Sequence, residues 1–81
     1  MNDIIDNAAN SAIRDAHDNW SEIYGEPEVG NDNQFAQTLE NLFIEYVMED
    51  TGCDEDEAWD YLQSCDKIQS EIALYTYTGR A

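Results

Sequence analysis

The chain has 81 residues, with nineteen Asp and Glu against three Lys and Arg, and its formal net charge at pH 7 is −16. This length suits one small domain but not two. The 42% share of hydrophobic residues and the single proline argue against a disordered acidic polymer. The charge disfavours direct binding to nucleic acid or to anionic membrane surfaces.

The N-terminal segment shows no targeting signal. It lacks a basic region followed by an apolar run, so we expect no signal peptide. No stretch approaches the roughly 20 apolar residues of a membrane-spanning helix. We therefore expect a cytoplasmic protein in which Cys53 and Cys65 are reduced thiols.

The first predicted helix covers residues 3–24, and Asn2 or Asp3 can cap it. Its apolar residues recur at steps of three and four, so they share one stripe. The stripe consists of Ile5, Ala9, Ala12, Ala16, Trp20 and Ile23. Gly25 and Pro27 end this helix, and residues 25–31 form the clearest loop of the chain.

The second predicted helix covers residues 33–50, with Asp32 or Asn33 as its cap. One face consists of Phe35, Leu39, Leu42, Phe43 and Tyr46. Ile44 and Met48 point nearly the opposite way. This second apolar face means either that the helix is sandwiched between other helices or that it meets another chain. The second alternative, which we favour slightly, would make the protein a homodimer or provide a face for a partner.

The third predicted helix covers residues 54–76, after a tight corner at Gly52. Asp54 and Glu57 have the spacing of a capping box. The apolar residues then alternate at steps of three and four, which predicts one long helix with a possible kink near Asp66. They are Ala58, Tyr61, Cys65, Ile68, Ile72 and Tyr75. We therefore predict an all-α fold, a three-helix bundle in a single acidic helical domain of residues 1–81.

The sequence lacks the motifs of catalysis and of cofactor binding. His17 is the only histidine and lies beside the apolar stripe, where a packed or solvated role is expected. No nucleophile elbow or glycine-rich phosphate loop occurs. An EF-hand register starting at Asp50 fails because Gly52 stands where an oxygen ligand is needed. We predict no enzyme activity, no cofactor and no metal site.

The stretch from Glu45 to Asp60, EYVMEDTGCDEDEAWD, is half acidic and contains no basic residue. Two carboxylates about 6 Å apart in water repel by roughly 0.7 kcal/mol. A surface that served only solubility would intersperse lysines. Part of the cluster has a structural explanation, because acids in the first turn of a helix complement its dipole. The acids are Glu45, Glu49, Asp50, Asp54, Glu55, Asp56, Glu57 and Asp60.

Such a row of carboxylates has the charge pattern of a nucleic-acid backbone. B-form DNA carries one negative charge per roughly 1.7 Å of axis, and acids at helical spacing lie about 5–6 Å apart. In its small size, its scarcity of basic residues and its lack of enzyme motifs, the chain resembles the small acidic phage-encoded inhibitors of host defence, the anti-CRISPR and anti-restriction proteins.

This resemblance implies an inhibitor that acts as a DNA mimic in the host cytoplasm. Its partner would be a basic nucleic-acid-binding protein, a Cas protein or a restriction enzyme, whose DNA groove it would occupy. The eight acids would replace phosphates, and Trp59, with Tyr61 and Met48, would add an apolar anchor. The alternative is an acidic adaptor or antitoxin-like module that binds a basic partner through the face of Ile44 and Met48. Acidic surfaces that are merely solvated are the third interpretation.

Overall fold

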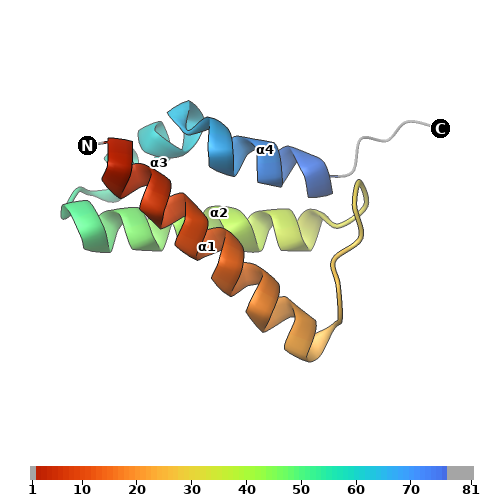
Figure 1. Ribbon diagram of the computed structural model, residues 1–81. Helices are drawn as coiled ribbons and strands as arrows, with labels where there is room; N and C mark the ends of the chain where they lie inside the picture. The colour runs from red at the N-terminus through yellow and green to blue at the C-terminus, as the bar shows by residue number, and fades with distance from the viewer. Residues whose placement is uncertain (1, 77–81) are drawn as a thin grey trace.

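The computed structural model describes residues 2–76, which form four α-helices and no strand (Figure 1). The helices are α1 (Asn2–Ile23), α2 (Asn33–Thr51), α3 (Glu55–Ser64) and α4 (Asp66–Tyr75). The all-α class predicted from the sequence is confirmed, whereas the three-helix bundle is wrong. The tail from residue 77, which contains Arg80, lies outside the described residues. No helix of the described part is long and apolar enough to cross a bilayer.

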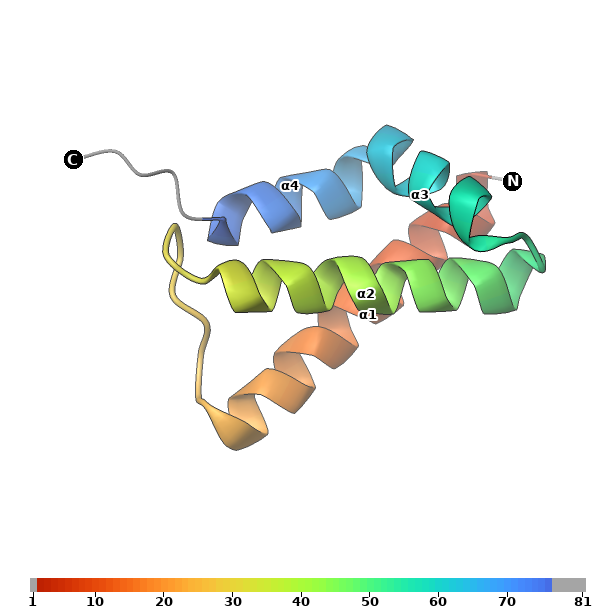
Figure 2. The ribbon, with the colours of Figure 1, turned by 180° about the vertical axis from the view of Figure 1, so that it is seen from behind.

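Helix α2 is the centre of the fold and packs against the other three helices. Figure 2 shows α1 crossing behind it at an angle, with α3 and α4 along another side. Large apolar side chains of α2 recur at helical spacing and are completely buried. They are Phe35, Leu39, Phe43 and Val47.

Helix α1 meets this core through small side chains. Ala9, Ala12 and Ala16 are fully buried, and side chains of this size allow the backbones of two helices to approach closely. The predicted apolar stripe of α1 is therefore buried at these three alanines, but Ile23 at the end of the stripe is 71% exposed. The angle at which α1 crosses α2 explains the difference, because the end of α1 diverges from the core (Figures 1 and 2).

The third predicted helix is in fact two helices that break at Cys65. The backbone there is extended, with φ −92° and ψ 101°, so the helical hydrogen-bond ladder is interrupted. Leu62 before the break and Ile68 after it are both buried, as is Cys65 itself. The alternating spacing predicted one helix because each half separately keeps its apolar side toward the core. The chain reverses direction at the Gly52 corner, and the break at Cys65 changes the direction between α3 and α4, so that α4 continues along α2 (Figure 2).

The second apolar face of α2 is largely covered by the chain itself, which favours the sandwiched arrangement for this face. Ile44 is buried, and Met48 is half-buried against the core. Because α2 contacts three helices, its apolar residues extend around more of its circumference than one stripe. The sandwiched arrangement therefore explains both residues without a second chain.

Side chains close the break between α3 and α4. The Gln69 side-chain amide donates a hydrogen bond to the Leu62 carbonyl at 2.9 Å, and the Ser64 hydroxyl donates to the Asp60 carbonyl at 3.1 Å. The Gln69 bond satisfies the Leu62 carbonyl, which is one of the last four carbonyls of α3 and has no donor four positions on within that helix. Helix α4 has no side-chain cap of its own at Cys65.

We predict that Gln69→Ala lowers the free energy of unfolding by about 1 kcal/mol, because it leaves the part-buried Leu62 carbonyl without this donor. Gln63→Ala is the matched control, since Gln63 is exposed on α3 and undergoes the same change of helix propensity. Urea unfolding followed by circular dichroism measures both. Equal effects of the two substitutions would contradict the assigned role of Gln69.

Candidate acidic interaction surface

All eight acids between Glu45 and Asp60 are exposed to solvent. We refer to these eight residues, on the last turns of α2, the connection and the start of α3, as the acidic corner. None of them takes part in an ion pair within residues 2–76. Their carboxylates are therefore presented to solvent without an internal counter-charge.

The corner is held by local hydrogen bonds that the sequence dictates. Gly52 adopts the left-handed conformation, with φ 72°, and its N–H donates to the Met48 carbonyl at 2.9 Å. The Asp54 carboxylate accepts from the Glu57 N–H at 2.9 Å and begins α3. The predicted corner and this half of the predicted capping box are confirmed. Three acids in the first turn of α3 also lie near the positive end of its dipole.

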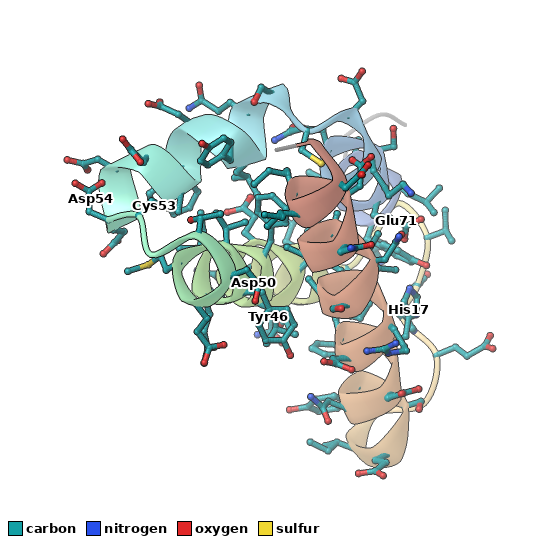
Figure 3. All side chains as sticks on the ribbon, turned by 60° about the vertical axis from the view of Figure 1, so that its left-hand side comes forward. His17, Tyr46, Asp50, Cys53, Asp54 and Glu71 are labelled. Carbon is teal, nitrogen blue, oxygen red and sulfur yellow. The ribbon has the colours of Figure 1, made fainter. Side chains whose placement is uncertain are left out.

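Arg14 and Lys67 are the two Lys and Arg residues in the described part of the chain, and neither forms an ion pair with the acidic corner. Arg14 pairs with Asp15 at 3.5 Å on α1 and lines a shallow pocket that also includes Asp50. Figure 3 shows Asp54 at the outer corner, whereas Asp50 and Tyr46 lie on the side that faces α1. Lys67 lines a different groove, between α1 and the junction of α3 with α4. Asp50 is therefore the member of the corner that lies nearest to Arg14 along this pocket.

Negative charge also extends beyond the acidic corner. The other eleven Asp and Glu lie on α1, on the loop before α2, on α2 itself and on α4. The corner contains eight acids within sixteen residues and is the densest stretch, but the whole molecule is an anion. Long-range attraction of a basic partner would therefore come from the entire chain, and close contacts from particular acids.

One acid was not singled out by the sequence but joins two helices. Tyr46 of α2 donates a hydrogen bond from its hydroxyl to the Asp15 carboxylate of α1 at 2.6 Å. This bond holds the pKa of Asp15 below its usual value of 3.8. The same bond raises the pKa of Tyr46 to about 12, together with burial and the negative charges of Asp15, Glu45 and Glu49. Sequence spacing indicated that Tyr46 faces inward, but it could not identify a partner 31 positions away.

The side chains predicted to form an apolar anchor for a partner are largely packed within the chain itself. Trp59, Tyr61 and Met48 are half-buried and pack against the core. Trp59 retains an exposed portion beside the acids of α3, so it still belongs to the candidate surface. Burial within the chain leaves these side chains less free to enter a pocket of a partner.

No metal centre is formed in the described residues, where no three potential ligands of the His, Cys, Asp and Glu type converge. Cys53 and Cys65 are free thiols. His17 packs beside the ring of Phe35 at 4.8 Å between centroids and lies 3.7 Å from the Glu71 carboxylate. These contacts join α1 to α2 and α4, and Figure 3 shows them on the side of α1 away from Tyr46.

Comparisons of the chain with protein-family models, with curated proteins and with solved structures found no match.

We predict that Tyr46→Phe lowers the stability of the fold most strongly between about pH 5 and pH 10. Because the fold lowers the pKa of Asp15, this carboxylate contributes to the free energy of unfolding above pH 3.8, and the contribution is lost as the pH falls through the pKa of the folded state. Because the fold raises the pKa of Tyr46, its hydroxyl contributes fully to the free energy of unfolding below pH 10, and this contribution is lost as the pH rises toward 12. The difference between variant and wild type should therefore shrink toward both extremes.

Urea unfolding at a series of pH values measures this difference. Tyr61→Phe is the control, because Tyr61 is half-buried as well but its hydroxyl does not join two helices. A difference between Tyr46→Phe and wild type that stays constant across the whole range would contradict the role of the Asp15–Tyr46 bond.

Proposed function

We propose that this protein inhibits a DNA-binding host defence system by acting as a DNA mimic. In this proposal the acidic corner enters the positively charged DNA groove of a CRISPR surveillance complex, a Cas nuclease or a restriction enzyme. Target DNA is then excluded because its phosphates and these carboxylates compete for the same Lys and Arg side chains.

The observation that carries the proposal is the exposure of all eight carboxylates of the acidic corner without an internal ion pair. Carboxylates that served only the fold would be expected to cap helices or to pair with Lys or Arg. Here one of the eight, Asp54, caps a helix through its side chain. The remaining acids keep their capacity to accept hydrogen bonds from a partner.

The helices give this charge a fixed geometry. Acids three or four positions apart on one helix are neighbours along one side, about 5–6 Å apart. Glu45 and Glu49 form such a pair on α2, and Asp56 and Asp60 form one on α3. Because the chain turns at Gly52, these two pairs of acids lie on helices that run in different directions. Rigid placement reduces the entropy cost of docking against a groove.

The alternative function, an adaptor that binds through an apolar helix face, loses its proposed contact. Ile44 is buried beneath the chain's own helices, and Met48 is half-buried. An adaptor would need a different face, whereas DNA mimicry uses side chains that are exposed in the folded chain.

We expect Glu45→Lys with Glu49→Lys, and separately Asp56→Lys with Asp60→Lys, to weaken inhibition by roughly tenfold or more each. Both pairs are exposed and leave the Asp54 cap intact. Each reversal places lysines where a basic groove provides its own cations. The measurement is competition with labelled target DNA for a purified CRISPR complex, Cas nuclease or restriction enzyme.

The control is Asp3→Lys with Asp6→Lys, which makes the same change of net charge at exposed positions of α1. This pair should weaken inhibition much less than either pair of the acidic corner. Equal losses from all three pairs would show that only net charge matters, and direct binding of the wild-type chain to DNA would contradict the proposal as well.

The affinity for the target should depend steeply on salt. We expect it to fall by roughly one to two orders of magnitude between about 50 mM and 200 mM NaCl, because counterions are released from both surfaces on binding. Each charge-reversal pair should also flatten the slope of log affinity against log salt. Isothermal titration or interferometry at four salt concentrations measures both, and a salt-independent affinity would rule out a carboxylate-to-cation interface.

A further inference from the structure

The most exposed apolar side chains lie at the end of the molecule away from the acidic corner. Ile23, Tyr24 and Val29 are 71%, 65% and 63% exposed, and Leu74 is 45% exposed. We refer to these four residues as the apolar end. In Figures 1 and 2 the end of α1 and the end of α4 lie apart, both at the end of the molecule opposite the Gly52 corner, and the loop before α2 runs between them.

The apolar end is held in place by the fold. The Gly30 N–H donates to the Leu74 carbonyl and the Asp32 N–H donates to the Tyr75 carbonyl, each at 2.8 Å, so the loop is tied to the end of α4. The ring of Tyr24 lies 4.5 Å from that of Trp20. Apolar groups that are already ordered cost less entropy when they bind. The hydrogen bonds hold the loop beside Leu74, and the contact between the rings of Trp20 and Tyr24 orders the end of α1.

The negative charge around the apolar end favours a cationic partner over a second copy of the chain. Asp18, Glu22, Glu26 and Glu28 are exposed within the same stretch of chain, and no Lys or Arg occurs from residue 15 to residue 66. A second copy would bring the same acids and a charge of −16 against them. A cationic partner would instead be attracted by the acids while it covers the apolar groups.

We infer that the apolar end is a second docking surface, which takes a cationic amphipathic segment of another protein. The apolar side of that segment covers Ile23, Tyr24, Val29 and Leu74, and its Lys and Arg side chains pair with the surrounding acids. This surface is separate from the acidic corner, so the inference does not depend on DNA mimicry. Burying one or two such side chains corresponds to roughly tenfold to hundredfold in affinity.

The test uses two synthetic helical peptides of equal positive charge. One has a leucine face opposite a lysine face, and the other has glutamine in place of each leucine. Binding is measured in about 150 mM NaCl, where the Debye length is about 8 Å and general charge attraction is screened. Amide chemical shifts of the labelled full chain locate the binding site. Trp59→Phe retains Trp20 beside Tyr24 as a fluorescent reporter of this end.

We expect the leucine peptide to bind at least roughly tenfold more tightly than the glutamine peptide and to shift the amides of residues 20–26, 28–30 and 74. Ile23→Ser with Val29→Ser should remove this difference, and both residues are exposed enough for the variant to fold. Ile4→Ser is the control, because Ile4 is also exposed but lies near the beginning of α1. The charge reversals of the acidic corner should change this binding by about twofold at most.

Three results would overturn the inference. The peptides could bind equally, or the leucine peptide could shift the amides of the acidic corner rather than those of the apolar end. Light scattering could also show a dimer that Ile23→Ser with Val29→Ser converts to a monomer, which would identify a second copy as the occupant. None of these results bears on competition with DNA, so the two proposals fail independently.

Discussion

The packing of three helices around α2 is the interaction on which the rest of this structure depends. The chain carries a charge of −16 on 81 residues, so self-repulsion opposes folding at neutral pH. The opposing contribution comes from one small core, in which Phe35, Leu39, Phe43 and Val47 are completely buried. Because α2 has to fill that core on several sides, its apolar residues are directed inward. The charged side chains remain on the surface, where the acidic corner is exposed to solvent.

The fold uses a few polar contacts between helices where a larger protein would use more apolar area. The Asp15–Tyr46 bond joins α1 to α2, and the Gln69 side chain joins α4 to the end of α3. His17 lies between Phe35, Tyr75 and Glu71, so it connects α1 with two other helices. Each contact sets how one helix crosses another. The placement of the acids in space therefore also depends on these contacts between helices.

The two candidate surfaces differ in the physics by which they would bind. The acidic corner offers charge at fixed spacing, which favours rapid association and strong salt dependence. The apolar end offers Ile23, Tyr24 and Val29, whose burial would slow dissociation and depend little on salt. A protein with both surfaces can engage a basic partner at one end and a cationic amphipathic segment at the other. The half-buried Trp59 shows that the corner by itself contains little free apolar area.

Local patterns in the sequence determined the helical class, the boundaries of α1 and α2, the cap at Asp54 and the corner at Gly52, because each depends on neighbours within four residues. They left the cap of α2 open between Asp32 and Asn33, and the structure identifies Asp32, whose carboxylate accepts a hydrogen bond from the Phe35 N–H. Exposure of the eight acids also followed, since unpaired carboxylates remain in water. Tertiary structure alone decided the break at Cys65, the burial of Ile44, the exposure of Ile23 and the Asp15–Tyr46 bond. These depend on how helices cross, which is set by packing between residues far apart in the chain, and helical periodicity contains no information about that angle.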